Sequence, residues 1–181
     1  EAQLNLARKH GAAVQINEIV GAVESDGNSA VTVKTSQGAY SAEKCIITAG
    51  PWIARFLPPE YAILFKVYRQ VMYWFAITED CRSSFAAPGF PIFIWIFGKG
   101  SEFGFYGFPT GDGETIKVAT EQFAASTDPD HVQRNVGIEE ERTMFINNLR
   151  DRLPGISDRC VTAAACLYTS TPDSNFVIGV H

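Results

Sequence analysis

The residues of this sequence best suited by type to chemistry are one cysteine, one lysine and two tyrosines: Cys166, Lys117, Tyr106 and Tyr168. A cysteine thiolate is a nucleophile that can bond covalently to a bound group. A lysine ammonium stabilises negative charge that develops beside it. Tyr168 follows Cys166 by two positions, so in a strand both side chains point to the same face, which would allow a shared site.

Composition alone favours plainer interpretations of the same residues. Cys166 ends a run of three alanines, where a cysteine is usually a small buried apolar residue. Lys117 lies between Ile116 and Val118, and a lysine in such an alternation usually faces solvent. Tyrosines in aromatic strands are usually part of the core, with each hydroxyl bonded to a neighbour.

The remaining titratable residues predict no metal site. The histidines are scattered and flanked by polar residues, which is typical of surface positions. The acidic residues around Gly111–Glu114 belong to a glycine-rich stretch that indicates a solvated turn. The four cysteines form no Cys-x-x-Cys pair, so we expect free thiols in a reducing, cytoplasmic compartment, and no signal peptide contradicts this.

Composition excludes several classes of protein. The chain has 181 residues, of which 46% are hydrophobic and 19% charged, enough apolar material for a packed core. A formal net charge of -5 without a run of Lys or Arg argues against a nucleic-acid-binding surface. No apolar stretch approaches the roughly 20 residues of a membrane helix.

Hydrophobic periodicity predicts an α+β protein. The first third of the chain reads as a helix, strands with hairpin turns and a short second helix: Glu1–His10, Ala13–Ile16, Ile19–Glu24, Ala30–Thr35, Tyr40–Thr48 and Trp52–Leu57. After Pro58 and Pro59 the pattern changes to aromatic antiparallel strands, a long helix and two further strands: residues Tyr61–Pro109, Thr115–Ala119, Val132–Leu153, Cys160–Tyr168 and Asn175–Ile178.

Four stretches, in this order, carry a family resemblance: Cys45–Trp52 (CIITAGPW), Val67–Val71 (VYRQV), Phe105–Pro109 with Ile116–Val118 (FYGFP, IKV) and Ala165–Asp173 (ACLYTSTPD). Their order and spacing resemble the FAD-dependent amine oxidases of the sarcosine oxidase and N-methyltryptophan oxidase group, within the D-amino-acid oxidase superfamily. The resemblance covers essentially the whole chain and adds to the periodicity, which alone gives no function.

The resemblance implies a domain organisation. Residues 1–64 would form the later part of an FAD-binding domain of α/β type, residues 65–166 a substrate domain with a mixed sheet and a packed helix, and residues 167–181 a return into the FAD-binding domain. The family's Gly-x-Gly-x-x-Gly fingerprint is missing from the sequence. The chain also opens without Met inside a helix, so we expect it to be the central part of a longer protein, inactive and without FAD by itself.

The resemblance also implies roles for individual residues. Cys166 would hold FAD covalently through a thioether, and Lys117 would promote reoxidation of the flavin by O2. Tyr106 and Tyr168 would lie near the substrate, whereas Ala49, Gly50 and Trp52 would contact the cofactor. Glu121 stands where sarcosine-specific members of the family have a histidine, so the charge of the substrate pocket would differ.

The predicted function is oxidation of a secondary N-alkyl amino acid, such as sarcosine or N-methyltryptophan, with O2 as acceptor and peroxide as product. By the same resemblance the longer protein would be a monomer, cytoplasmic or, in a eukaryote, peroxisomal. Two alternatives stay open: a flavin dehydrogenase of the same superfamily that passes electrons to another protein, and a non-catalytic binding module. Lys117 favours the oxidase over the dehydrogenase, and a glycine-rich fingerprint ahead of Glu1 would favour an enzyme over a module.

Overall fold

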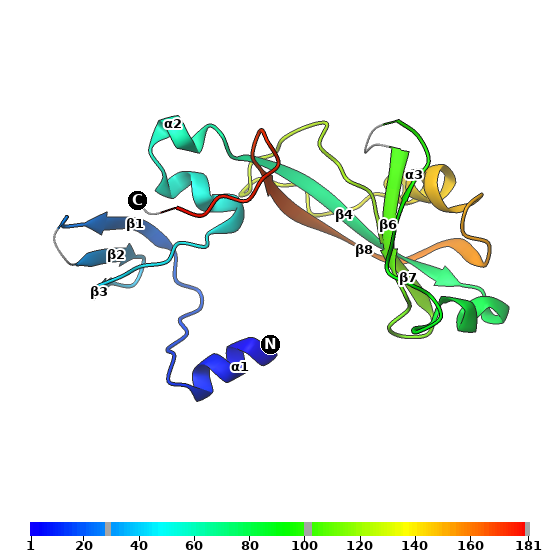
Figure 1. The fold of residues 1–181 in the computed structure, drawn as a ribbon, viewed down its shortest axis with the longest axis horizontal. Coiled ribbons are helices and arrows are strands. Elements are labelled where there is room, and N and C mark those ends of the chain that lie inside the picture. The colour runs from blue at the N-terminus through cyan, green and yellow to red at the C-terminus, as the bar shows by residue number, and fades with distance from the viewer. Residues whose placement is uncertain (28–29, 100–102, 180–181) are drawn as a thin grey trace. The chain divides into compact units, whose positions relative to one another are not determined.

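The computed structural model describes residues 1–27, 30–99 and 103–179 (Figure 1). The chain divides into two compact units, residues 1–49 and residues 50–181, and each is described by itself. The predicted domain boundaries at residues 64 and 166 refer to the longer protein and stay a prediction.

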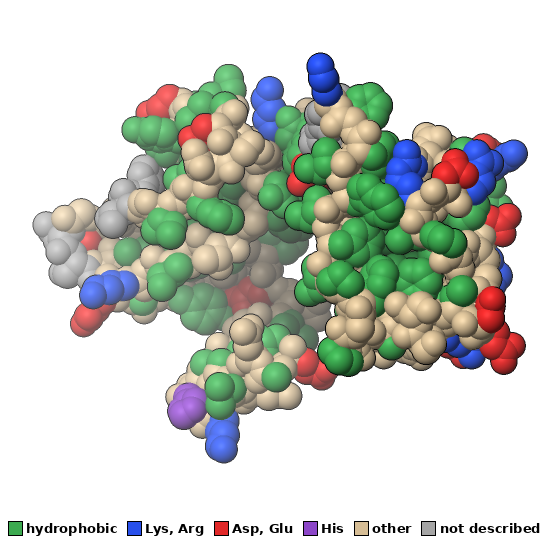
Figure 2. All heavy atoms as spheres, turned by 45° about the vertical axis from the view of Figure 1, so that its right-hand side comes forward, with side chains coloured by type: hydrophobic (Ala, Val, Ile, Leu, Met, Phe, Trp, Pro, Cys, Tyr) green, Lys and Arg blue, Asp and Glu red, His purple; other side chains and the backbone are tan. Residues whose placement is uncertain are grey.

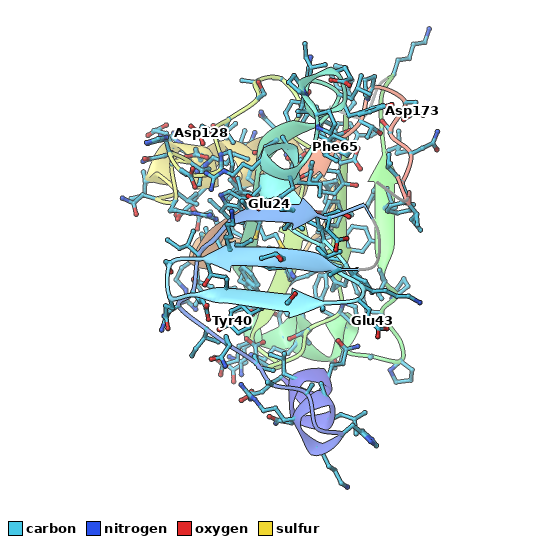
Figure 3. The ribbon with its side chains drawn as sticks, turned by 90° about the vertical axis from the view of Figure 1, so that its left-hand side faces the viewer. Glu24, Tyr40, Glu43, Phe65, Asp128 and Asp173 are labelled. Atoms are coloured by element: carbon cyan, nitrogen blue, oxygen red, sulfur yellow. The ribbon has the colours of Figure 1, made fainter. Side chains whose placement is uncertain are left out.

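The first unit consists of the helix α1 (Ala2–Lys9) and a three-stranded antiparallel meander, β1 (Val20–Ser25), β2 (Val31–Thr35) and β3 (Ala39–Ala42). The strands lie side by side in Figure 3, with Glu24 on β1 and Tyr40 on β3. The Glu18 carboxylate accepts hydrogen bonds from the hydroxyls of Thr35 and Tyr40, which ties the entry to β1 to the other two strands. The predicted first helix and the two hairpin strands are therefore confirmed.

Two strand predictions in this unit were wrong. Residues 13–16 form no strand, and the run to Thr48 leaves the strand conformation after Ala42. A strand needs a neighbouring strand to satisfy its backbone groups, and among the described residues none pairs with residues 43–49. Apolar character alone did not make a strand here, and Ile46 is 88% exposed.

The second unit is built on a five-stranded sheet of order β5-β6-β7-β4-β8. Its strands are β4 (Lys66–Ile77), β5 (Phe93–Ile96), β6 (Gly104–Phe108), β7 (Thr115–Ala119) and β8 (Ile156–Ser170), preceded by η1 (Gly50–Phe56) and α2 (Pro59–Ala62), with η2 (Glu79–Phe85) between β4 and β5. All the described strand pairs of this sheet are antiparallel, where a mixed sheet was predicted. The two long strands β4 and β8 cross the unit together in Figure 1.

One face of this sheet, the packed face, carries the core. Phe75, Val71 and Ile116 are fully buried there, together with Leu149 and Met144 from the helical segment that covers it. Full burial of each large apolar side chain contributes about 1.5–3 kcal/mol. The predicted α+β class and the predicted helix packed on the sheet are confirmed.

The helix predicted over Val132–Leu153 begins later, because the preceding residues are held in another conformation. It consists of α3 (Ile138–Met144) and η4 (Phe145–Leu149), and the Glu140 side chain accepts a hydrogen bond from the Gly137 backbone N–H at its start. Arg69 donates hydrogen bonds to the carbonyl oxygens of Gln133 and Asn135 at 2.6 and 3.0 Å, so those carbonyls are used outside any helix. Residues 175–178, predicted as a strand, also lie outside the sheet, with Phe176 completely exposed.

Within the residues described, no helix is long and apolar enough to cross a membrane, and no three His, Cys, Asp or Glu side chains are grouped to hold a metal ion. Figure 2 shows hydrophobic side chains gathered on one face of the sheet-bearing unit, with charged side chains toward its margin. Exposed isoleucines of this unit include Ile94 and Ile96 on β5 and Ile92 just before it, which are 66–77% exposed. Apolar surface of this kind commonly marks a contact with another group.

Candidate functional site

Strand register brings the predicted chemical residues to the other face of the sheet, which we call the open face. In an antiparallel pair, directly opposite residues point to the same side. Cys166 lies opposite Gln70 and Tyr168 opposite Tyr68, while Lys117 lies opposite Trp74. Tyr106 joins them through Ala119, which is paired with both Tyr106 and Met72. The open face is therefore Tyr68, Gln70, Met72 and Trp74 of β4, with Cys166, Tyr168, Lys117, Ala119, Tyr106 and Phe108.

Lys117 lies on β7, the middle strand of the five. Its ammonium nitrogen Nζ lies 5.3 Å from the centre of the Trp74 ring and 5.2 Å from the centre of the Phe108 ring. Both distances are within the range of a cation–π interaction. The lysine is half-buried between two aromatic rings, whereas composition alone suggested a plain solvent-facing residue.

Tyr106 and the residues around it share one electrostatic environment. Burial raises the pKa of the Tyr106 hydroxyl, and the charges of Glu121, Cys166 and Tyr168 raise it further. These four residues come from three separate parts of the chain, and three of them belong to the open face. Tyr168 itself is 54% exposed, so this part of the site is accessible.

A short segment after β7 is held against the edge of the open face. The Gln70 amide donates to the Gln122 carbonyl at 2.6 Å and accepts from the Gln122 N–H at 2.9 Å, so a side chain replaces a strand partner. Phe123 packs edge-on against Tyr68 and Tyr168, with ring centres 5.2 and 5.8 Å apart. Sequence reasoning gave Gln70 no role and missed Phe123, because neither contact follows from periodicity.

The spacing of Lys117 and Cys166 limits which group could meet both side chains. Lys117 and Cys166 are two strands and four residues apart in the ladder, which corresponds to about 17 Å between their Cα atoms. Only an extended group lying between them could meet both side chains. A thiol at one end and a cation at the other, with Met72, Ala119 and Ala164 in the row between them, suit the flavin ring of FAD in chemistry.

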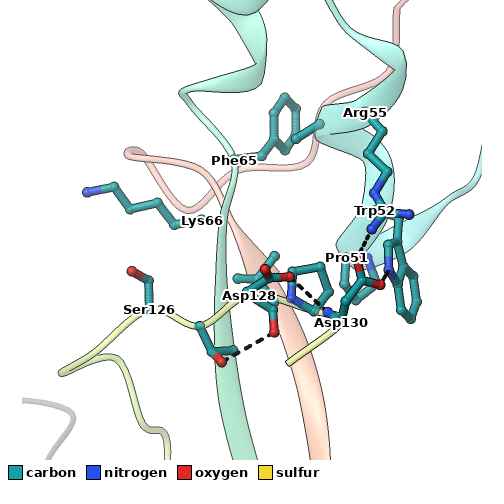
Figure 4. Close-up of a pocket in the computed structure, with 12 residues that line it drawn as sticks. Pro51, Trp52, Arg55, Phe65, Lys66, Ser126, Asp128 and Asp130 are labelled. Atoms are coloured by element: carbon teal, nitrogen blue, oxygen red, sulfur yellow. Dashed lines mark hydrogen bonds and ion pairs between the residues drawn. The ribbon is translucent and has the colours of Figure 1, made fainter. Parts of the chain in front are cut away.

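The predicted cofactor residues Ala49, Gly50 and Trp52 lie outside the open face. Ala49 ends the first unit, and Gly50, with φ of 52°, begins η1. The Trp52 indole N–H donates to the Asp130 carboxylate at 2.8 Å, and Arg55 forms an ion pair with the same carboxylate. Figure 4 shows this arrangement at the wall of a cavity of about 400 Å³. Asp130 therefore joins η1 to the segment 126–130 in which it lies.

A second cavity, of about 460 Å³, is lined by Tyr73, by Thr120 and Gln122 after β7, and by the helical segment that covers the packed face. Burial raises the pKa of Tyr73 to about 12, and the nearby Glu140 charge adds to this effect. Asn148 at the same cavity is buried and donates to the Met144 carbonyl at 3.2 Å. This cavity therefore belongs to the packing around Tyr73 and the helical segment.

Comparison with known proteins identifies the family. The sequence model of the FAD dependent oxidoreductase family matches residues 1–181. The chain belongs to this family.

Among curated relatives, this FAD dependent oxidoreductase chain is 32% identical over 183 residues to a monomeric sarcosine oxidase of Bacillus sp. (strain NS-129), covering 100% of the chain and 46% of that protein. It is 34% identical over 176 residues to an N-methyl-L-tryptophan oxidase of Salmonella enteritidis, covering 97% of the chain and 44% of that protein. The chain thus spans about half the length of the relatives it matches. The family resemblance noted from the sequence is confirmed.

Solved structures support the fold. The open form of NikD, an unusual amino acid oxidase essential for nikkomycin biosynthesis, matches with a TM-score of 0.73 at 23% identity, over 96% of this chain and 44% of that one. Glycine oxidase from Geobacillus kaustophilus matches with a TM-score of 0.62 at 20% identity, over 97% of this chain and 42% of that one. At these identities the similarity establishes the arrangement of strands and helices.

Proposed function

We propose that this chain is the central part of a longer FAD-dependent oxidase, called here the whole protein, that acts on secondary N-alkyl amino acids such as sarcosine or N-methyltryptophan. The observation that carries the proposal is the register that gathers a thiol, a lysine and two tyrosines on one face of the sheet. Membership of the FAD dependent oxidoreductase family indicates that the cofactor is FAD. Bound FAD would take two electrons and two protons from the amine, leaving an imine that water hydrolyses, and O2 would take them up as hydrogen peroxide.

Cys166 is proposed to attach the cofactor. On the open face of β8 the preceding neighbour of Cys166 is Ala164, so little side-chain bulk lies on that side of the sulfur. Forming a thioether removes one hydrogen from the thiol and one from a ring methyl group, and O2 would accept both. Tyr168, on the same face two residues away, would lie near the attached ring.

Lys117 is proposed to favour the reaction with O2, because a fixed cation stabilises negative charge as an electron reaches oxygen. Tyr106 and Tyr168 would orient the substrate through their hydroxyl groups. Glu121, within electrostatic reach of Tyr106, would add negative charge to the substrate pocket. A pocket of that charge suits a substrate that is larger than sarcosine or carries additional positive charge.

The test is to express the whole protein and to replace Cys166 and Cys160 one at a time by alanine. Cys160 is a matched control because it lies on the same strand but packs against the core, where burial raises the pKa of its thiol to about 11. We expect flavin to stay with the denatured wild type and Cys160→Ala proteins and to be released from Cys166→Ala.

Flavin released from all three proteins would refute covalent attachment at Cys166. A whole protein that binds no flavin would favour the binding module instead. Flavin that is reduced by amino acids but reacts with an artificial acceptor and not with O2 would favour the dehydrogenase.

A further inference from the structure

A lysine side chain has four rotatable bonds, so its charge acts at a defined point only if something restrains it. Lys117 stands on the middle strand with a direct cross-strand neighbour on each side, Trp74 on β4 and Phe108 on β6. Side chains stand roughly perpendicular to a sheet, so these two rings flank the lysine along its length. The ammonium lies 5.3 and 5.2 Å from the ring centres.

The chemical nature of these neighbours matters. Within the part of the chain that the structure describes, Lys117 forms no ion pair with a carboxylate. An adjacent carboxylate would cancel most of the field of the ammonium at a nearby group. Aromatic rings attract a cation through their quadrupole and carry no net charge. They can therefore restrain Lys117 and leave its positive charge available to the open face.

We propose that Trp74 and Phe108 are positioning residues that hold the Lys117 ammonium where it favours the reoxidation of flavin by O2. The proposal rests on the role given to Lys117 under the proposed function. The two residues, called here the aromatic bracket, act through Lys117 and need not touch substrate or oxygen. The ordinary alternative is that both rings only contribute apolar packing to the sheet.

The first test detects the contact without measuring activity. Reductive methylation with ¹³C-formaldehyde converts lysines to dimethyl-lysines, which keep their charge. The Lys117 signal is assigned in the whole protein by its loss in Lys117→Arg. We expect ring currents to shift this signal away from those of the other lysines, and Trp74→Leu to move it back toward them. A Lys117 signal that coincides with the others in the unmutated protein overturns the proposal.

The second test is a double-mutant cycle in the whole protein, with the reduction and reoxidation of flavin measured separately by stopped flow. We expect Trp74→Leu to slow reoxidation about tenfold, as the loss of a cation–π contact would, and to slow reduction much less. Trp74→Phe keeps a ring and should recover most of the rate. In a Lys117→Met background, Trp74→Leu should have no further effect. Phe108→Leu gives a second, independent cycle if Trp74→Leu folds poorly.

Thr162→Ala is the control, because Thr162 lies opposite Trp74 on its other side and carries no ring. If Trp74→Leu and Phe108→Leu slow reoxidation equally with and without Lys117, the rings have only a structural role and the proposal is overturned. If Lys117→Met slows reoxidation but neither ring variant does, the aromatic bracket alone is refuted. If Lys117→Met leaves reoxidation unchanged, the role of Lys117 in the proposed function fails as well.

Discussion

Replacing Arg69 by methionine should destabilise the sheet-bearing unit strongly. The guanidinium donates to the carbonyls of Gln133 and Asn135 at 2.6 and 3.0 Å and to the two carboxylate oxygens of Glu140 at 2.8 and 3.2 Å. Its side chain is only 19% exposed, while that of Glu140 is 40% exposed. A hydrogen bond to a charged group contributes about 1.5–3 kcal/mol when buried, and partial exposure reduces this.

Taking about 1 kcal/mol for each of these bonds, we expect Arg69→Met to lower the free energy of unfolding by about 3–4 kcal/mol. Methionine keeps the apolar stem of the side chain and lacks the guanidinium, so the loss reports chiefly the hydrogen bonds. The assay is urea unfolding of the whole protein, together with hydrogen exchange of residues 131–144. Arg134→Met is the control, because Arg134 has a single bond of 3.1 Å to the Ala165 carbonyl and is exposed. We expect it to cost less than about 1 kcal/mol.

The pH dependence gives the same prediction a second check. The hydrogen bond from Arg69 is the main cause that holds the pKa of Glu140 below its ordinary value. A carboxylate with a lowered pKa in the folded state stabilises the fold above its unfolded pKa of about 4.3. That contribution is lost as the pH falls through the lower folded value. The stability gap between wild type and Arg69→Met should therefore narrow below about pH 4. A cost no larger than that of Arg134→Met, or a gap that widens in acid, would refute the reasoning.

Three further substitutions test local structure, each by urea unfolding of the whole protein. Gly155→Ala should cost about 3 kcal/mol, because Gly155 has a φ of +95° and a Cβ there would lie 2.6 Å from the Cys81 Cβ. Gly113→Ala, with a φ of +79° but nothing within 4 Å, should cost only about 1 kcal/mol, and equal losses would contradict this view. Asp112→Ala should cost about 1 kcal/mol near neutral pH, because hydrogen bonds from Thr115 and Glu114 hold the pKa of the exposed Asp112 carboxyl well below its ordinary value. Since a lowered folded pKa stabilises only the charged form, this difference should vanish in strong acid, and a constant difference would exclude the carboxylate as its cause.

Sequence periodicity predicted those elements whose own residues determine them. The strand Thr115–Ala119 was predicted with its observed ends because β-branched and alternating residues are bounded by turn residues on one side. The helix over Val132–Leu153 was predicted too long because its apolar stripe continues in the sequence. The side chain that holds residues 133 and 135 outside the helix, Arg69, comes from a strand more than sixty positions earlier. Such long-range bonds have no local signal.

The candidate site divides in the same way. Alternation placed Cys166 and Tyr168 on one face, since they belong to one strand. It could not show that Lys117 and Tyr106 point to that same face, because this depends on the pairing between strands. The aromatic neighbours of Lys117 were visible in the sequence as members of aromatic strands. Their position opposite the lysine is a property of the register, for which a single sequence carries little information.

The packing of the core also decides where the chemical residues lie. Ile116 and Val118 are fully buried on the packed face and pair with strand residues that are buried there too, Phe75 and Tyr73. Burying Ile116, Val118 and Phe75 contributes about 6 kcal/mol in total. Because side chains alternate along a strand, burying Ile116 and Val118 places Lys117 on the open face. A slip of one residue would exchange the faces, burying the ammonium and exposing the isoleucine and the valine. The apolar residues on either side of Lys117 therefore select the register, and that register sets the lysine between Trp74 and Phe108.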